Sequence, residues 1–181
     1  MRSKLLKAVI LLAVVITLAI FIKGKSPMAE ESKAPSAGHL HGVDADQINW
    51  SEKNKDYWKE VLSPKQFEVC REAGTERAFS GFYNTYKKDG TYHCSNCGQP
   101  LFSSAAKFDS GTGWPSFYQA IKSDNIALRN DHSFFSSRTE VVCGRCGAHL
   151  GHVFDDGPAP TGKRFCINSV CLIHDEQLKT K

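Results

Sequence analysis

The sequence contains the pentapeptides CSNCG at residues 94–98 and CGRCG at residues 143–147. In each, two cysteines separated by two residues bring their thiols together in a tight turn, and the glycine that follows relieves the backbone. Two such turns supply the four sulfur ligands that zinc takes in structural sites. The ligands are expected to be Cys94, Cys97, Cys143 and Cys146. Because four cysteines leave no open coordination position, this metal should stabilise the fold and take no part in the chemistry.

The alternative reading of these turns is two disulfides or a redox-active C-x-x-C motif, which an exported protein permits. A thioredoxin-like motif, however, would be single and would lie in a β-α-β pattern, and the chain has no such pattern. The sequence therefore favours one zinc site per chain.

Around the two turns the sequence predicts a mainly β domain with a short helical lead-in. Ser63 and Gln66 form a capping box, Pro64 suits the first helical position, and the helix should run to about Ala73, where Gly74 ends it. After Phe82, short runs of β-branched and aromatic residues alternate with turn residues, as in an antiparallel sheet. The expected strands cover residues 91–94, 100–103, 126–129, 133–142, 149–154 and 164–173.

Residues 1–25 are typical of a membrane-targeting segment, because basic residues flank the uncharged apolar run of residues 8–22. Counted from Leu5, with Lys7 snorkelling, a helix would be about 27 Å long against a hydrocarbon core of roughly 30 Å. Pro27 and Pro35 disrupt the nearest cleavage sites, so an uncleaved signal anchor is favoured over a cleaved signal peptide. The charge asymmetry places the domain outside the cytoplasm, in a periplasm or a secretory-pathway lumen, or secreted if the segment is cleaved.

Composition divides the rest of the chain. Residues 26–49 lack aromatic side chains and read as a flexible linker, residues 50–175 as the globular domain, and residues 176–181 as a polar tail. The net charge of +4 arises in the anchor, which holds five basic residues and leaves 23 − 5 = 18 basic against 19 acidic residues. The near-neutral domain therefore excludes a nucleic-acid-binding surface.

Three cysteines remain outside the predicted zinc site: Cys70, Cys166 and Cys171. In RFCINS, residues 164–169, strand alternation places Arg164, Cys166 and Asn168 on one face. A guanidinium lowers the pKa of a nearby thiol, and only the thiolate attacks. Cys166 is thus a candidate nucleophile, and the alternative is an inert buried cysteine.

Two further segments favour the nucleophile. His149 and His152 directly follow the second cysteine turn, and they are free for acid–base work because zinc already has four ligands. Gly151 is expected to mark a bulge that turns both histidines inward. Trp114 stands in a glycine- and proline-framed loop, where an indole can wall a pocket, although plain core packing is the alternative.

Taken together, EAGTERAFS at residues 72–80, the two C-x-x-C turns, GWPSF, HLGHVF and RFCINS resemble the B-type methionine sulfoxide reductases. The motifs occur in the family's order over about residues 58–172. The resemblance implies two antiparallel sheets, with zinc at the far end from the chemistry. It also implies thiol-dependent reduction of the R epimer of peptidyl methionine sulfoxide, a repair of oxidised proteins.

By the same resemblance, Cys166 is the nucleophile, whose thiolate attacks the sulfoxide sulfur and becomes a sulfenic acid. His149, His152 and Asn168 match the polar residues that hold and protonate the sulfoxide oxygen.

The resemblance also assigns residues around the nucleophile. Trp114 and Phe154 would bind the substrate, with Trp114 packing against its S-methyl group. Asp156 and Arg164 would orient the site and favour the thiolate.

Many family members carry a resolving cysteine where this chain has Thr112. Cys70, in the lead-in helix, is the preferred substitute. Cys171 is a weaker choice, because five extended residues place it about 16 Å from Cys166 on the opposite face. Direct reduction of the sulfenic acid by a thioredoxin-like protein or a small thiol is the third possibility.

The expected partners are oxidised proteins, a thioredoxin-like reductant and, through the anchor, a membrane; the chain is expected to be a monomer. A zinc-stapled β domain that binds a peptide or small molecule without catalysis is the competing function. That reading leaves Cys166, Arg164, Asn168 and both histidines without a purpose.

Overall fold

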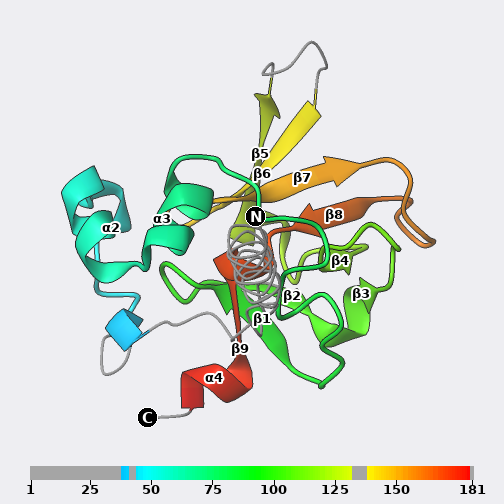
Figure 1. Ribbon diagram of the computed structural model, residues 1–181, viewed down its shortest axis with the longest axis horizontal. Helices are drawn as coiled ribbons and strands as arrows, with labels where there is room; N and C mark the ends of the chain where they lie inside the picture. The colour runs from blue at the N-terminus through cyan, green and yellow to red at the C-terminus, as the bar shows by residue number, and fades with distance from the viewer. Residues whose placement is uncertain (1–37, 41–43, 132–137, 180–181) are drawn as a thin grey trace, which may run out of the picture. The chain divides into compact units, whose positions relative to one another are not determined.

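The computed structural model describes residues 38–40, 44–131 and 138–179 (Figure 1). The chain divides into two units, Met1–Glu31 and Ser32–Lys181, and all described residues belong to the second. The predicted membrane anchor, residues 1–25, lies outside the described residues. Within the described ranges, no helix is both long enough and apolar enough to cross a membrane.

Two antiparallel sheets form the domain, as predicted (Figure 1). The smaller sheet has the order β2-β1-β9, with β1 at Thr91–Cys94, β2 at Pro100–Ser103 and β9 at Leu172–His174. The larger sheet has the order β3-β4-β8-β7-β6-β5. Its strands are β3 (Lys107–Phe108), β4 (Ser116–Phe117), β5 (Ile126–Asp131), β6 (Arg138–Cys143), β7 (His149–Phe154) and β8 (Arg164–Ile167).

Aromatic side chains join the two sheets. Phe102 on β2 stacks on Phe117 on β4 with ring centroids 4.5 Å apart, and Tyr92 on β1 meets Phe117 edge-on at 5.2 Å. All three rings are fully buried. Such contacts favour one arrangement of the sheets, because offset and edge-on aromatic pairs add about 0.5–1.5 kcal/mol beyond area burial.

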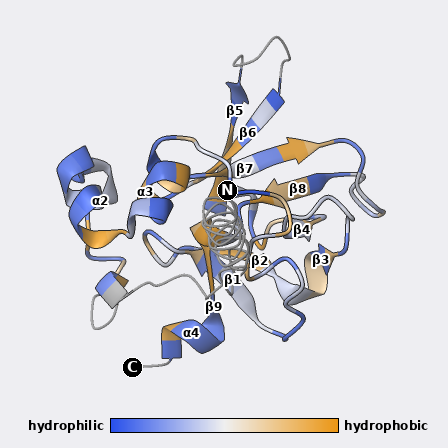
Figure 2. Ribbon diagram, viewed as in Figure 1, coloured by the Kyte–Doolittle hydropathy of each residue, from blue (hydrophilic) through white to orange (hydrophobic). Residues whose placement is uncertain are grey.

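Three helices lie beside the sheets (Figure 1): α2 at Lys55–Val61, α3 at Pro64–Arg71 and α4 at Asp175–Lys179. The predicted capping box of α3 is confirmed, because the Ser63 and Gln66 side chains each bond the other's backbone amide. Helix α3 ends slightly before the expected residue: Ala73 takes a left-handed φ of 53°, and the Gly74 amide donates to the Glu68 carbonyl. Figure 2 shows that α2 is mostly hydrophilic, as expected of a helix that buries only one side. Its buried residue is Trp58.

The expected strand at residues 164–173 is wrong in one respect, because it is interrupted. Strand β8 ends at Ile167, a 3-10 turn occupies Ser169–Cys171, and β9 then pairs with β1 in the other sheet. The Cys171 amide closes the turn by donating to the Asn168 carbonyl at 3.1 Å. The chain therefore crosses from one sheet to the other within a few residues of Cys166.

The packed domain extends at both ends beyond residues 50–175, the range that composition indicated. In the segment assigned to the linker, Ala45 and Ile48 pack against the core, and the Ala45 carbonyl accepts a 2.8 Å hydrogen bond from the Trp50 indole. At the other end, residues assigned to the polar tail form most of α4, where Glu176 accepts a 2.7 Å hydrogen bond from the Tyr86 hydroxyl.

Candidate functional site

The two C-x-x-C turns converge on one buried point. The Sγ atoms of Cys94, Cys97, Cys143 and Cys146 all lie within 4.8 Å of one another. The Cys94–Cys146 and Cys97–Cys143 sulfur pairs are 3.8 and 3.5 Å apart. A tetrahedral site with Zn–S bonds of about 2.3 Å spaces its sulfurs about 3.8 Å apart, so these residues fit a four-sulfur metal.

Local backbone geometry explains why the turns form. Gly98 and Gly147 have φ of +74° and +68°, a region that residues with a Cβ rarely adopt. Each glycine amide donates to the carbonyl of the first cysteine of its turn at 2.9 Å. In each turn, the two thiols therefore point in the same direction, which confirms the role predicted for the glycines.

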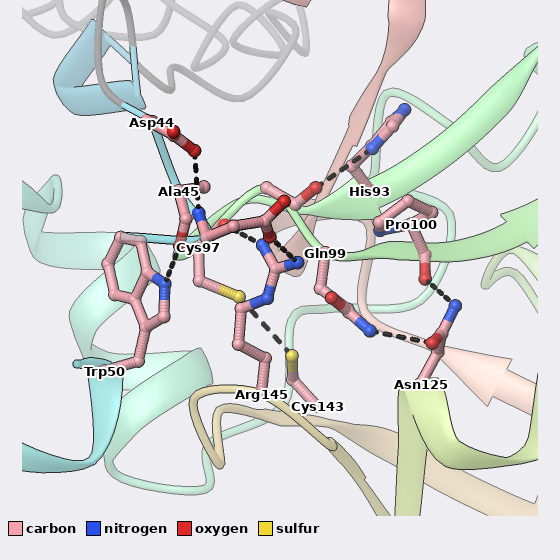
Figure 3. A network of polar contacts seen from close by, with 12 residues as sticks. Asp44, Ala45, Trp50, His93, Cys97, Gln99, Pro100, Asn125, Cys143 and Arg145 are labelled. Atoms are coloured by element: carbon pink, nitrogen blue, oxygen red, sulfur yellow. Dashed lines mark hydrogen bonds and ion pairs between the residues drawn. The ribbon is translucent and has the colours of Figure 1, made fainter. Parts of the chain in front are cut away.

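Two arginines place positive charge beside the sulfurs. Arg71 donates to the Cys146 carbonyl at 3.0 Å, lies 3.9 Å from its Sγ, and stacks its guanidinium 4.1 Å above the Trp58 ring. Figure 3 shows the Cys97 and Cys143 sulfurs facing each other beside Arg145, which donates to the Cys97 carbonyl at 3.3 Å. Burial raises the pKa of the Cys94 thiol above its usual range.

The candidate nucleophile lies in the middle of the larger sheet. On β8, Cys166 pairs with Ser116 of β4 on one side and with His152 of β7 on the other. Its side chain is partly exposed, and the charge of Arg164 on the same strand acts on its thiol.

The charge of Arg164 was expected to lower the pKa of Cys166, but the net shift of this pKa is upward. Burial raises the pKa of the Cys166 thiol above its usual range, and the Arg164 charge opposes that rise without overcoming it. Asp156 acts in the opposite sense to Arg164. In the protein without substrate, the thiol is therefore favoured over the thiolate more than the sequence indicated.

Arg164 and Asp156 form the orienting pair that the resemblance implied. Arg164 Nε and Nη2 donate to the two Asp156 carboxylate oxygens at 2.8 and 2.9 Å, which is bidentate geometry. The guanidinium also lies 4.4 Å over the Phe154 ring, and Arg164 is only 8% exposed. Stacking and ion pairing thus hold the guanidinium beside Cys166, and Phe154 supports it directly.

A bulge brings the two histidines together, as the glycine between them predicts. The β6–β7 register shifts so that Val141 pairs with Gly151 and Val142 with His149. A Cβ on Gly151 would lie 2.0 Å from the Cys166 carbonyl, so only glycine fits there. The His149 and His152 rings are consequently 5.5 Å apart instead of on opposite faces.

Carboxylates orient both imidazoles. His149 Nδ1 lies 2.7 Å from a Glu140 oxygen, and His152 Nε2 lies 2.8 Å from an Asp131 oxygen. Burial lowers the pKa of His149. With Nδ1 engaged, His149 Nε2 is buried and has no hydrogen-bond partner among the described residues.

The remaining predicted residues meet at Glu76, a residue that the sequence reasoning missed. The Glu76 amide donates to Asn168 Oδ1 at 3.1 Å, and its carbonyl accepts from the Trp114 indole at 3.1 Å. Its carboxylate accepts from the amides of Ser169 and Val170, directly after the nucleophile strand. Glu76 is therefore a positioning residue for both Trp114 and Asn168.

Both polar atoms of the Asn168 side chain are already hydrogen-bonded within the protein. It is 3% exposed, and its Nδ2 also donates to the Leu150 carbonyl at 3.1 Å. Trp114 is half-buried and lies outside the hydrophobic core, so its ring is fixed by Glu76 and not by core packing.

Replacing Glu76 by glutamine is expected to destabilise the protein by about 1–3 kcal/mol, because one of two buried amides would face an NH₂ group in place of an acceptor. Thermal unfolding measures this loss, and the matched control is Glu60→Gln, an exposed position that should shift stability by less than about 0.5 kcal/mol. Equal melting temperatures for the two variants would show that Glu76 does not hold this turn.

The expectation that Cys70 is the resolving thiol is wrong. Cys70 forms a disulfide with Cys171, with Cα atoms 5.8 Å apart and 101 residues between them in sequence. The 3-10 turn brings Cys171 out of line with β8, and both sulfurs lie in the core. All seven cysteines are thereby assigned, and Cys166 is the one free thiol of the described chain outside the metal cluster.

Glu140 and Asp131 are, with Glu76, the functional residues that sequence reasoning missed. Their only signal is an acidic residue at the end of β5 and another within β6, and acidic residues in such positions are common on solvated sheets. Glu76 lies inside the segment EAGTERAFS, so the motif contained the residue without indicating its burial.

The chain is similar to a known protein family and to several named enzymes. A family model described as the SelR domain matches residues 62–176. A peptide methionine sulfoxide reductase MsrB of Methanosarcina barkeri is 63% identical over 123 residues, covering 67% of this chain and 85% of that protein. Enzymes of the same name from Methanosarcina mazei and Pseudomonas fluorescens are each 60% identical, over 68% and 67% of this chain and 89% and 93% of their own lengths.

Proposed function

The chain belongs to the SelR domain family, and from this premise we propose that it reduces the R epimer of peptidyl methionine sulfoxide. It is an oxidoreductase of the methionine sulfoxide reductase class. The observation that carries the residue assignment is the position of Cys166, the one free thiol outside the metal cluster, next to Arg164 and opposite His152.

In the first step, Cys166 Sγ attacks the sulfoxide sulfur as its thiolate. The bond that this attack forms between the two sulfurs is transient and breaks again; in the net step the oxygen passes to Cys166 sulfur, so the substrate's sulfur–oxygen bond breaks, a sulfur–oxygen bond forms on Cys166, and one proton is taken up. The products are methionine and a Cys166 sulfenic acid, so the substrate is reduced by two electrons and Cys166 is oxidised by two.

The surrounding residues supply binding and the proton. His149 Nε2, unpartnered in the described structure, is placed to bind the sulfoxide oxygen, and Glu140 on the other ring nitrogen stabilises the imidazolium that would donate a proton. His152 and Asn168 complete the polar side of the site. Trp114 is the wall for the S-methyl group, and the Phe154 ring stacks against the Arg164 guanidinium.

Recycling is proposed to be direct. The sulfenic acid consumes two thiols, which become a disulfide, while Cys166 returns to its thiol and water is released. A thioredoxin-like dithiol fits this role, because Cys70 and Cys171 already bond each other and neither offers a thiol to Cys166.

The four-cysteine centre is proposed to hold zinc. Four thiolates at this spacing, with no open ligand position, suit a tetrahedral metal without redox chemistry. Bound there, zinc would supply structural stability only, and Arg71 and Arg145 would offset part of the thiolate charge.

Export to an oxidising compartment is part of the proposal. The apolar N-terminal segment and the Cys70–Cys171 disulfide both suit a protein outside the cytoplasm, where structural disulfides persist. The substrates would then be oxidised proteins on that side of the membrane, and the reductant would have to reach the same side.

The test uses the full chain with peptides carrying either sulfoxide epimer. With dithiothreitol, the R epimer should be reduced and the S epimer should not. After one turnover without reductant, mass spectrometry of the non-reduced protein should find a sulfenic acid at Cys166 and the Cys70–Cys171 disulfide unchanged. Equal reduction of both epimers would contradict the specificity, and a new disulfide to Cys166 would contradict direct recycling.

A further inference from the structure

Phe79 is the most exposed of the large apolar side chains in the described part of the chain. It is 69% exposed, whereas Leu128 and Ile121 are 55% and 40% exposed. Its backbone has a φ of +65°, in the left-handed region that a residue with a Cβ rarely adopts. An exposed aromatic ring on a strained backbone costs free energy on both counts, so this position points to a role other than folding.

The segment that carries Phe79 is bonded to the loop that carries Trp114. The Trp114 indole donates to the Glu76 carbonyl at 3.1 Å, and the Phe79 amide donates to the Gly113 carbonyl at 2.8 Å. A Cβ on Gly113 would lie 2.9 Å from the Phe79 ring, so the ring packs directly against this glycine. These contacts fix Phe79 beside the loop that presents Trp114.

Phe79 also lines a cavity of about 610 Å³. Ligand sites in proteins have volumes of about 300–1,000 Å³, so the cavity is large enough for a side chain. Tyr86 and Phe108 line it as well, and Gly111 brings in the loop of Trp114. Because Gly111 is three residues before Trp114, their Cα atoms are separated by at most roughly 11 Å.

The formal charges around the cavity cancel. Three lysines and two aspartates line it: Lys87, Lys88, Lys107, Asp89 and Asp109. One of the lysines, Lys88, forms an ion pair with Glu176 at 2.8 Å, and Lys107 Nζ donates to the Asn84 carbonyl at 3.0 Å. Aromatic walls without net charge favour an uncharged apolar guest over an ion.

We propose that Phe79 and this cavity bind an aromatic or large aliphatic side chain of the same peptide that presents methionine sulfoxide to Trp114. The inference rests on the proposed function and deepens it, because it makes Phe79 a specificity-determining residue for the sequence around the sulfoxide. An extended peptide advances about 3.3–3.6 Å per residue. A side chain two to four residues from the sulfoxide therefore reaches the cavity.

The experiment measures kcat/KM of the full chain, with its metal bound and dithiothreitol as reductant, on two sets of peptides. Each peptide contains R-methionine sulfoxide. One set carries a phenylalanine two, three or four residues before or after the sulfoxide, and the matched set carries serine at the same position. At one position or more, the phenylalanine peptide should be preferred by about fivefold, mainly through a lower KM, because its ring leaves water.

Three variants assign this preference to the cavity. Phe79→Ala should reduce it to less than about twofold while the serine peptides react as with the wild type, and Phe79→Tyr, which keeps the ring, should restore it. Thr85→Trp places a bulky ring in the cavity from another lining residue and should also abolish the preference. The matched control is Leu128→Ala, which removes an exposed apolar side chain from β5, at the other edge of the larger sheet, and should change nothing.

The outcomes separate this inference from the function on which it rests. Equal kcat/KM for both peptide sets, or a preference that survives in a Phe79→Ala protein with an unchanged melting temperature, would overturn the inference alone. So would a Phe79→Ala protein whose KM rises for a thioredoxin and not for the phenylalanine peptides, because the cavity would then serve the reductant. Failure to reduce any R-sulfoxide peptide would overturn the proposed function, and this inference with it.

Discussion

Replacing Cys166 by serine is expected to abolish methionine sulfoxide reduction while the protein stays folded. A serine hydroxyl occupies nearly the same volume, but it does not ionise near neutral pH and cannot form a sulfenic acid. Cys166 is partly exposed and bonded to no other cysteine, so its sulfur is not part of the core. Turnover of the R epimer with dithiothreitol is the measurement.

The control for this variant is a pair of measurements on the same protein, its metal content and its melting temperature. Metal content and the melting temperature should equal those of the wild type, because the nucleophile and the four metal cysteines share no atom. Turnover near the wild-type level in a verified Cys166→Ser protein would remove Cys166 from the nucleophile role.

Replacing Cys97 by serine is expected to have the opposite pattern, with loss of metal and of the folded state together. Structural zinc contributes on the order of 10 kcal/mol or more to folding, whereas domains are stable by only about 5–15 kcal/mol. The first metal turn also holds the 3-10 turn before β9, because the Ser95 amide donates to the Cys171 carbonyl at 3.0 Å. Elemental analysis and thermal unfolding measure the two losses.

Cys166→Ser is the matched control here, since it is also a cysteine-to-serine change but lies outside the cluster. A chelator should reproduce the effect of Cys97→Ser on the wild-type chain. If a metal-free protein proved stable and fully active, the structural role of the centre would be refuted.

Much of the site could be predicted because its determinants are local. The cysteine turns, the capping box at Ser63 and the bulge at Gly151 depend on a few consecutive residues, and each has the expected geometry. Several strands match for the same reason, since a period of two is visible in the sequence. The resemblance to the B-type methionine sulfoxide reductases is confirmed by the family match over residues 62–176.

The prediction failed where a residue's state depends on distant segments. Cys70 looked available as a thiol until folding placed it against Cys171, 101 residues away. The net pKa of Cys166 rises because burial outweighs the field of Arg164, and burial is set by the packing of strands β4, β7 and β8.

The amino-acid order alone determined the family and predicted the metal ligands and the nucleophile, because each prediction depends on short motifs whose chemistry needs particular side chains close together along the chain. The tertiary structure decided the partners of the site residues: Glu76 bonds Trp114 and Asn168, and Glu140 and Asp131 bond the two histidines. Those contacts join residues up to 92 positions apart, and only the pairing and packing of the sheets brings such residues within hydrogen-bond distance.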